Sequence, residues 1–357
     1  MGSVNIKESN QHFLLEITPM QDTSPECLRE WIKANHELVQ DKIALHGGLL
    51  FKGFAVKTAA DFENIALSID ANLTDKHIFD GGVGTKRTKF VSDVANPEIK
   101  KILTPLSLHN EDSFVAETPT KIMFCSLNSA PWGGESLIAD CRKVYQSLSQ
   151  KIQNKYRNQK LTSTLVLEDR LFLANSQIPK NVQYITEFAK DNGAETVKRV
   201  SDNMTEFSFT IPAVITSKTS EEAIWFNTLH QAVFYNNCID IWMAYKLLGG
   251  FSNRIKSLFL IFSSLLQDFV TYIKSGRNPL EMHDCKLVNG LKITAWDRIE
   301  MGLAFWENTA ILPLKDGDFF VLDNRLTAHG RMPYKGKRVM VSAMTKPKAT
   351  KYEHRTA

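Results

Sequence analysis

Two histidines and one carboxylate are the residues of this chain best suited to hold a metal ion. His109 and Glu111 are separated by one residue, and His329 lies far along the chain. In a β-strand, residues i and i+2 point to one face about 7 Å apart, so a strand over 106–111 would direct His109 and Glu111 to one point. This donor set leaves coordination positions open, as oxygen-using iron(II) sites require. A structural zinc site would close its fourth position, usually with a thiolate, and no cysteine neighbours either histidine.

The C-terminal part of the chain carries the strand pattern that would position His329. Apolar residues occupy positions 310–314 and 319–322, and the turn sequence KDGD lies between them. An Asp-Gly pair between two apolar runs is a strong signal of a β-hairpin. A second turn sequence, KGK, precedes an apolar run over 338–344 and predicts a second hairpin. Two hairpins at the end of a chain rich in helical patterns indicate a β core wrapped by helices, and a jelly roll is one such core.

Helical periodicity dominates much of the rest of the chain. Apolar residues recur at helical spacing, and they predict helices over residues 27–45, 59–69, 140–152, 252–273 and 295–307. Short apolar runs followed or preceded by turn residues predict strands at 49–51 and 122–127. The segment 153–225 mixes both kinds of signal, so the sequence does not order its elements.

The most apolar stretch of the chain, residues 255–273, lies in one of these predicted helices. Lys256, Gln267 and Asp268 interrupt it, whereas a membrane span needs about 20 consecutive, predominantly apolar residues. The pattern therefore favours a buried amphipathic helix over a membrane span.

The bulk composition excludes several classes of function. The 357 residues are 43% hydrophobic and 23% charged, which is ordinary for a soluble globular protein with a sizeable core. The net charge of +4 is small and the basic residues are scattered, which argues against a nucleic-acid partner. Five cysteines without a CxxC pair favour free thiols in a reducing compartment. Because residues 1–11 lack the apolar core of a signal peptide, we expect a cytoplasmic protein with no membrane partner.

Four motifs, in order along the chain, resemble the taurine dioxygenase (TauD/TfdA) family and especially its clavaminate synthase-like branch. The first is GGLLFKGF at 47–54, and the second is LHNE at 108–111. The branch has His-x-Glu at the second motif, where most of the wider family has His-x-Asp. The third motif is GGES at 133–136, and the fourth is LDNR at 322–325 followed by AHGR at 328–331. The order and number of the motifs make the match specific.

The resemblance implies an Fe(II)- and 2-oxoglutarate-dependent oxygenase that consumes O₂ and holds iron through His109, Glu111 and His329. The implied fold is α+β, a double-stranded β-helix (jelly roll) wrapped by helices, with a largely helical insertion at about 150–295 between the two halves of the metal site. We expect a lead-in, one oxygenase domain and a tail, over residues 1–22, 23–347 and 348–357. Related halogenases have a small residue in place of the carboxylate, so Glu111 argues for oxygen transfer or desaturation.

By the same resemblance, an arginine after the distal histidine binds the distal carboxylate of 2-oxoglutarate. Arg338 is the first candidate, because its sequence surroundings are similar to the family's run there, and Arg331 of the HGR sequence is the second. A planar guanidinium suits this task because it can hold two carboxylate oxygens at once. Ser136 is carried over as a hydroxyl partner of that carboxylate. Ser342 stands where sulfonate-using members carry a second arginine, so a taurine-like sulfonate is not expected as the substrate.

Substrate-side residues are predicted from two further stretches that resemble the branch. The sequence WFNTLH offers Phe226, Asn227 and His230 to a polar substrate, and Arg87 follows a stretch similar to the loop over the mouth of the site. The alternatives are a core position for Phe226, a turn cap at Asn227 and a surface charge at Arg87.

The predicted reaction is the hydroxylation, desaturation or cyclisation of a small polar substrate, an amino acid or amino-acid derivative, in secondary metabolism. This substrate is either free or linked to a carrier protein. Two other classes stay open. A non-redox metal-binding hydrolase or sensor on the same fold would not depend on 2-oxoglutarate, and an interaction protein would keep the three residues as a vestige.

Overall fold

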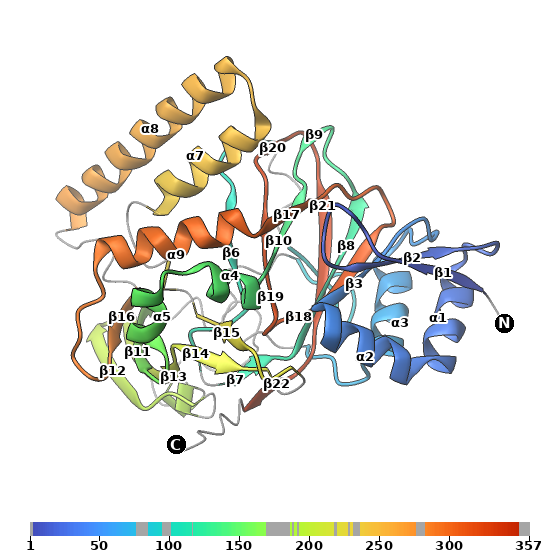
Figure 1. Ribbon diagram of the computed structural model, residues 1–357, viewed down its shortest axis with the longest axis horizontal. Coiled ribbons are helices and arrows are strands. Elements are labelled where there is room, and N and C mark those ends of the chain that lie inside the picture. Colours follow the sequence, from blue (N-terminus) through green and yellow to red (C-terminus); the bar gives the residue numbers. More distant parts are fainter. Residues whose placement is uncertain are drawn as a thin grey trace.

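Two stacked β-sheets form the centre of the molecule in the computed structural model (Figure 1). It describes residues 3–75, 85–94, 101–115, 117–168, 186–187, 189–190, 193–217, 220–227, 229–230, 236–275 and 283–349. The larger sheet contains, in spatial order, β1 (Val4–Lys7), β2 (Leu15–Pro19), β3 (Gly48–Phe51), β18 (Phe319–Asp323), β8 (Lys121–Asn128), β21 (Val339–Met344) and β4 (Ser92–Asp93). The smaller contains β17 (Thr309–Leu312), β10 (Ser136–Asp140), β19 (Thr327–Arg331) and β6 (Leu106–His109). This pair of sheets is the predicted jelly-roll core in an α+β fold.

Strand β8 shows how the sheets and helices pack in layers. Ile122 and Phe124 belong to the apolar cluster between the two sheets, where they meet Ile138 of β10. Met123 and Cys125 alternate with them and belong to the cluster under the N-terminal helices. Because both faces of β8 are buried, the strand has the continuous apolar run that predicted it.

Three helices, α1 (Pro25–Ala34), α2 (His36–His46) and α3 (Ala59–Ile69), cover the outer face of the larger sheet (Figure 1). The prediction of α3 is confirmed. The single helix predicted over 27–45 is instead two helices. They divide at Asn35, whose side-chain amide and backbone N–H both donate to the carbonyl of Trp31 and end α1. Gly47, with φ of 76°, ends α2 as its position in the sequence predicts.

The helices on the other side cover the smaller sheet and the region beyond it: α4 (Cys141–Ser147), α5 (Gln150–Tyr156), α7 (Asn236–Leu248), α8 (Phe251–Ser275) and α9 (Ala295–Glu307). The bounds of α9 are those predicted, and a capping box between Thr294 and Asp297 begins it. The helix predicted over 140–152 is two short helices, because Leu148 is extended and Ser149 caps α5.

Two predictions about domain organisation need correction. The polar lead-in predicted over 1–22 contains β1 and β2, and Leu15 and Ile17 of β2 are buried in the core. The insertion predicted as largely helical contains α7 and α8 but also a four-stranded antiparallel sheet, β12-β13-β11-β16, and the β14–β15 hairpin. These strands are β11 (Lys160–Glu168), β12 (Thr196–Ser201), β13 (Met204–Pro212), β14 (Val214–Thr216), β15 (Ala223–Trp225) and β16 (His283–Leu287).

Neither predicted C-terminal hairpin forms. The Asp-Gly turn joins β17, which pairs with β10, to β18, which pairs with β3 and β8, so the chain passes from one sheet to the other. The second turn follows β20 (Tyr334–Lys335), which pairs with β5 (Lys101–Ile102) and β9 (Trp132–Gly133), and leads to β21 in the larger sheet. A tight turn with glycine at positive φ (Gly317 at 88°, Gly336 at 86°) serves a sheet-to-sheet corner as well as a hairpin.

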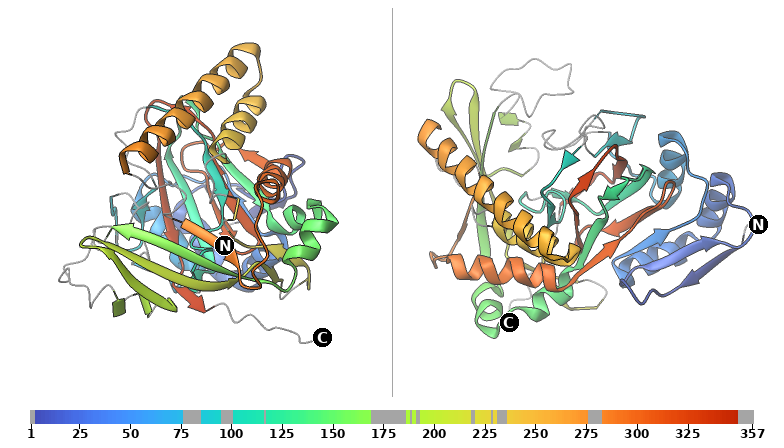
Figure 2. Two further views of the ribbon diagram at one scale, coloured as in Figure 1. Left: turned by 90° about the vertical axis from the view of Figure 1, so that its left-hand side faces the viewer. Right: turned by 90° about the horizontal axis from the view of Figure 1, so that it is seen from above.

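The apolar helix predicted as buried is α8, and most of its apolar side chains are exposed. It lies on α7 at the edge of the molecule (Figure 2). No helix within the described residues is long and apolar enough to cross a membrane. The prediction that α8 is no membrane span therefore agrees with the structure, and the prediction that it is buried is wrong.

The turn at Gly317 gives a test of the sheet-to-sheet corner. A Cβ at Gly317 would lie 2.9 Å from the carbonyl oxygen of Phe54 and 3.1 Å from that of Val56, at a φ that L-residues rarely adopt. We expect Gly317→Ala to cost about 1–3 kcal/mol and to lower the melting temperature by several degrees. Gly290→Ala is the matched control, because Gly290 has φ of 79° but no atom within 4 Å of its Cβ position. Equal losses for both variants in calorimetry would contradict the close packing at the corner.

Candidate functional site

His109, Glu111 and His329 converge at the smaller sheet, as the sequence predicts. One ligand atom from each residue lies within 4.8 Å of the others. The Oε2 atom of Glu111 is 3.8 Å from Nε2 of His109 and 3.6 Å from Nε2 of His329. Two imidazole nitrogens and one carboxylate oxygen at these separations surround a volume suited to one divalent ion, with positions left for exogenous ligands.

Strand pairing brings the two histidines together. Strands β6 and β19 are antiparallel neighbours, and His109 is the register partner of His329. The imidazole rings lie with their centroids 4.3 Å apart, and Phe124 packs on the other side of His329 at 4.8 Å. Glu111 lies beyond the end of β6, and Asp112, at positive φ (53°), turns the chain there. The carboxylate thus comes from a turn at the rim of β6, which is one of the two possibilities, a strand or its rim, that the sequence leaves for 106–111.

Asn324 joins the two halves of the site. Its side-chain oxygen accepts from the N–H of Glu111 (2.7 Å), and its amide donates to the carbonyl of Glu111 (2.9 Å) and of Pro119 (2.9 Å). In return, Asn110 donates to the backbone carbonyl of Asn324 (2.6 Å). The turn that presents Glu111 is therefore held by the loop that leads to His329. The LDNR motif contains Asn324, but a single sequence does not show which residue its amide bonds.

A second network orients His109. Its Nδ1 lies 2.8 Å from the carbonyl oxygen of Ser107, which leaves Nε2 facing the other donors. The hydroxyl of Ser107 donates to buried Asp240, which also accepts from the indole N–H of Trp306 at 2.6 Å. Burial, and then the nearby His329, lower the pKa of His109 to about 4. His109 is therefore neutral at pH 7, which is the form that binds a metal.

Two neighbouring arginines, Arg338 buried and Arg331 partly buried, lie beyond the histidines. Arg338 is 8% exposed, and it donates from Nε to the carbonyl of Gly134 at 3.1 Å. The guanidinium groups of Arg331 and Arg338 lie 4.9 and 5.7 Å from the ring centroid of Tyr334. Neither arginine forms an ion pair within the part of the chain that the structure describes. Burial, and then the positive charge of Arg331, lower the pKa of Arg338 to about 10, so it stays charged at neutral pH. The carboxylate of Glu135 partly opposes this lowering of the pKa but forms no ion pair with Arg338, so the guanidinium remains suited to an anionic ligand.

The GGES motif makes room for these arginines. A Cβ at Gly133 would lie 2.0 Å from the carbonyl oxygen of Pro333, and one at Gly134 would lie 3.1 Å from Cδ of Arg338. Both glycines have positive φ. Ser136, 4% exposed, follows on β10 as the register partner of Arg331. The motif therefore allows β9 and β10 to approach the segment that carries both arginines, and the structure brings Ser136, Arg331 and Arg338 into one region.

The predicted substrate residues are mostly engaged elsewhere. Asn227 is 1% exposed; its amide donates to Ala213 and its oxygen accepts from the N–H of Leu229, so it caps a turn. Phe226 is 2% exposed and lies in the core. Arg87 is paired with the buried carboxylate of Asp93, with its Nε 3.0 Å from each oxygen. The loop residues 79–82 lie outside the described residues.

His230 hydrogen-bonds to the strand that carries His109. It is 3% exposed, and its Nε2 donates to the carbonyl of Leu108 at 2.7 Å, beside His109. The ring packs on Phe305 with centroids 4.2 Å apart, and burial lowers its pKa to about 4. The structure therefore gives His230 a place in positioning β6, where the sequence predicted a substrate contact.

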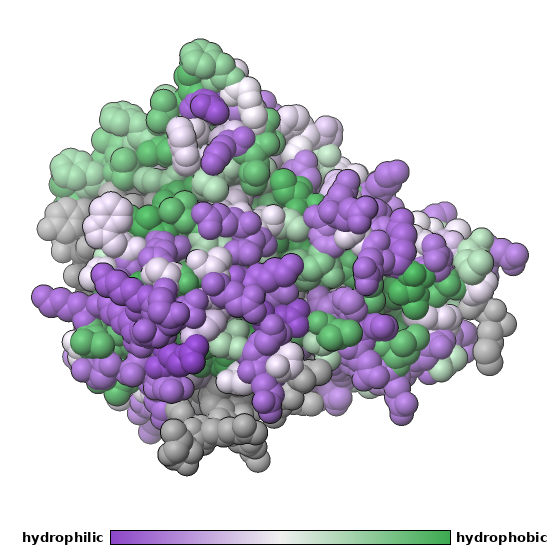
Figure 3. Space-filling view, in the orientation of Figure 1, coloured by the Kyte–Doolittle hydropathy of each residue, from purple (hydrophilic) through white to green (hydrophobic). Residues whose placement is uncertain are grey.

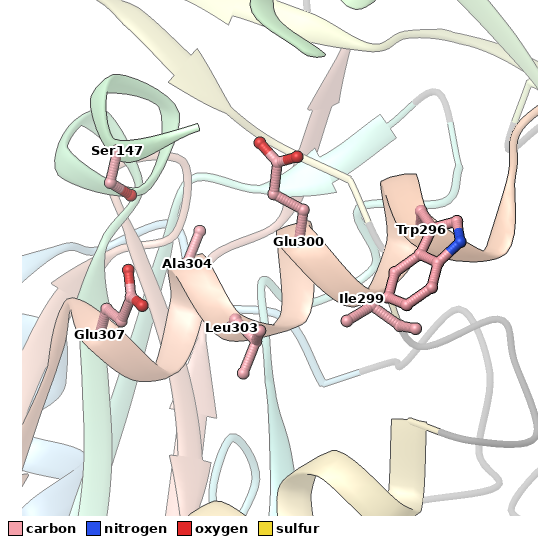
Figure 4. A pocket seen from close by; sticks show the side chains of 7 residues that line it. All are labelled: Ser147, Trp296, Ile299, Glu300, Leu303, Ala304 and Glu307. Carbon is pink, nitrogen blue, oxygen red and sulfur yellow. The ribbon is translucent and has the colours of Figure 1, made fainter. Parts of the chain in front are cut away.

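A groove elsewhere on the molecule is not this site. It has a volume of about 300 Å³ and lies between α9 and the end of α4 (Figure 4). Its lining residues are Ser147, Trp296, Ile299, Glu300, Leu303, Ala304 and Glu307. None of them is a candidate metal or co-substrate residue.

Comparisons with known proteins agree with this geometry. Residues 17–249 match the family described as taurine catabolism dioxygenase TauD, TfdA family. The chain belongs to the TauD/TfdA family. It is an Fe(II)- and 2-oxoglutarate-dependent dioxygenase, and O₂ is its second co-substrate.

Curated relatives cover most of the chain at low identity. The dapdiamide synthesis protein DdaC of Enterobacter agglomerans is 22% identical over 88% of this chain and 86% of its own length. A clavaminate synthase-like protein of Arabidopsis thaliana is 21% identical over 92% of this chain and 90% of its own. The name of the second relative is that of the predicted branch.

Solved structures share the fold. A taurine dioxygenase from Burkholderia xenovorans has a TM-score of 0.53 at 12% identity, covering 98% of this chain and 93% of that one. AAD-2, in complex with Mn(II) and N-oxalylglycine, has a TM-score of 0.51 at 13% identity, covering 96% and 97%. At these identities the likeness shows the jelly-roll fold alone.

Substitution of the three converging residues tests the metal site. We expect His109→Ala, Glu111→Ala or His329→Ala each to abolish iron binding and turnover, because two remaining ligands rarely hold a labile divalent ion. The measurement is anaerobic iron(II) titration followed by 2-oxoglutarate, read as a visible charge-transfer band. His36→Ala, which removes an exposed histidine of α2, should keep the band. A full-strength band in any of the three variants would remove that residue from the site.

The two arginines make separable predictions about 2-oxoglutarate. We expect Arg338→Ala to raise the 2-oxoglutarate requirement by about two orders of magnitude or more, since loss of one partner of a buried charge pair costs about 3–5 kcal/mol. Arg331→Ala should have the smaller effect, and Lys337→Ala, at an exposed neighbour, should have none. Succinate formation against 2-oxoglutarate concentration measures all three. A larger increase in the 2-oxoglutarate requirement for Arg331→Ala than for Arg338→Ala would exchange the roles assigned to the two arginines.

Proposed function

We propose that this dioxygenase oxidises an unactivated C–H bond of a small polar substrate, an amino acid or amino-acid derivative, in secondary metabolism. In this proposal His109, Glu111 and His329 hold the iron. The donor set fits the ion, because these three side chains already lie within 4.8 Å of one another and His109 is held neutral. Bound iron(II), with 2-oxoglutarate and O₂, supplies the oxidant that such a bond requires.

The observation that carries the proposal is a pair of neighbouring arginines, Arg338 buried and Arg331 partly buried, that form no ion pair within the described residues. Arg338 is the better co-substrate ligand, because it is the more buried and its Nε is already held by Gly134. We assign it the distal carboxylate of 2-oxoglutarate, with Ser136 as the hydroxyl partner. A buried guanidinium without an ion-pair partner is costly, so an arriving carboxylate would reduce that cost.

Arg331 would then be left for a second carboxylate, that of the substrate. Arg331 comes two residues after His329 on β19, so the two side chains lie on the same face of the strand. Its Nη1 atom is buried without a hydrogen-bond partner in the described chain, while Nη2 faces the carbonyl of Thr104 at 3.4 Å. A carboxylate-bearing substrate such as an amino acid would satisfy it.

Two further observations support this substrate class. Ser342 stands where sulfonate-using members carry arginine, and it lies on β21, where it is 8% exposed. The relative DdaC is named for the synthesis of dapdiamide, which points to secondary metabolism. A substrate linked to a carrier protein would present the same polar groups without a free carboxylate, so Arg331 favours the free form.

A panel of amino acids tests the substrate class. We expect at least one carboxylate-bearing amino acid to stimulate succinate formation from 2-oxoglutarate, with close to one oxidised product for each succinate. The matching carboxamide should stimulate far less in the wild type, and Arg331→Ala should remove the difference between acid and amide. Stimulation by a sulfonate or a lipid, with none by free or carrier-linked amino acids, would reject this substrate. The absence of any dependence on 2-oxoglutarate would instead favour a hydrolase or sensor.

A further inference from the structure

Helix α8 carries a regular stripe of exposed apolar side chains. The stripe consists of Ile255 (53% exposed), Phe259 (67%), Phe262 (66%), Leu266 (51%), Phe269 (57%) and Ile273 (64%). Soluble monomers rarely expose apolar patches larger than a few hundred Å². In the space-filling view, green apolar side chains gather along this part of the molecule (Figure 3).

The spacing of the stripe indicates what would cover it. The six residues are separated alternately by four and three positions, which is a repeat of 3.5 residues over almost three heptads. Apolar residues at this repeat form the a/d seam of a coiled coil and predict packing against another helix. The opposite side of α8 is already used, since α8 packs on α7 and Ser257 is 1% exposed. The missing partner is therefore a helix that lies along the stripe.

The stripe is complementary to itself when two copies run antiparallel. In that arrangement Ile255 of one copy lies opposite Ile273 of the other, Phe259 opposite Phe269, and Phe262 opposite Leu266. Each a position then meets a d position, and the two residues of each pair are of the same type except in the central pair, Phe262 with Leu266. A two-fold symmetric interface pairs residues reciprocally in this way, because one patch must fit a second copy of itself.

The area and the charges agree with such an interface. Phenylalanine side chains bury roughly 150–250 Å² each, so covering the stripe would bury on the order of 700 Å² per copy, near the ~800 Å² per partner of a standard interface. The charged residue beside the stripe, Lys256, lies over the rings of Trp132 (5.6 Å) and Tyr245 (5.7 Å) of its own chain. The antiparallel register places Lys256 opposite position 272 of the second copy, which is an uncharged tyrosine, so Lys256 meets no like charge there.

From these observations we propose that the enzyme is a homodimer in which α8 packs antiparallel on α8 of a second copy, with the two-fold axis near the middle of the helix. The two α7–α8 pairs then form a four-helix layer between the protomers. This surface is separate from the candidate metal and arginine residues, so the proposal does not depend on the substrate assignment.

Light scattering after size exclusion tests the dimer. We expect the wild type to have a mass of twice 40.4 kDa and Phe262→Glu to have the single-chain mass with an unchanged circular dichroism spectrum. Arg254→Glu places the same charge on an exposed position of α8 outside the stripe and should stay dimeric. A wild type that is monomeric at all concentrations up to ~100 µM, or a dimeric Phe262→Glu, overturns the proposal.

Mixing two variants tests the direction of packing. A heterodimer in the mixture would also show that both variants are folded. Phe262→Glu and Leu266→Lys should each be monomeric alone. Mixed, they should form a heterodimer, because position 262 of one copy faces position 266 of the other only in the antiparallel arrangement. If the mixture stays monomeric, the antiparallel packing of α8 on α8 is wrong. Wild-type binding to vesicles of phosphatidylglycerol and phosphatidylcholine as a monomer would instead assign the stripe to a membrane surface and overturn the dimer.

Discussion

The antiparallel pairing of β6 with β19 is the constraint on which the active site depends. The pairing places His109 directly opposite His329, and neither strand alone carries a usable donor set. Glu111 joins them only because Asn324 bonds both its N–H and its carbonyl. The donors are thus positioned by main-chain geometry, and the entropy of ordering them is lost during folding rather than when the metal binds. Support for β6 from His230 and for His109 from Ser107 serves the same purpose.

The second requirement is electrostatic. Two guanidinium groups lie over one aromatic ring, burial and the charge of Arg331 lower the pKa of Arg338, and the described chain supplies no ion-pair partner for either arginine. Such an arrangement costs stability in the free protein, and the proposed carboxylate ligands would offset that cost. The glycines at 133 and 134 permit it, because side chains there would collide with the neighbouring segment.

The sequence predicts well what local patterns determine. The helices α3 and α9, the strand β8 and the convergence of the three donors all follow from periodicity, caps or motifs. Partner choice between strands does not: the Asp-Gly turn at Gly317 has the same local chemistry whether its flanking strands pair with each other or with different sheets. The same limit applies to WFNTLH, where Asn227 satisfies its own turn and His230 a neighbouring carbonyl. A single sequence also gives the spacing of α8 but not the face on which it packs, so its exposed stripe was predicted as core.

The order of the strands in space also bears on when the site can exist. The centre of the larger sheet is β18-β8-β21 and that of the smaller is β10-β19, so strands from the last 40 residues of the described chain lie between strands from its first half. A growing polypeptide on the ribosome therefore has neither the two closed sheets nor His329 beside His109 until β18, β19 and β21 have been made. A chain that stops before β19 would lack one of the three candidate metal ligands. Closure of the two sheets thus sets the point in synthesis at which these three side chains first meet.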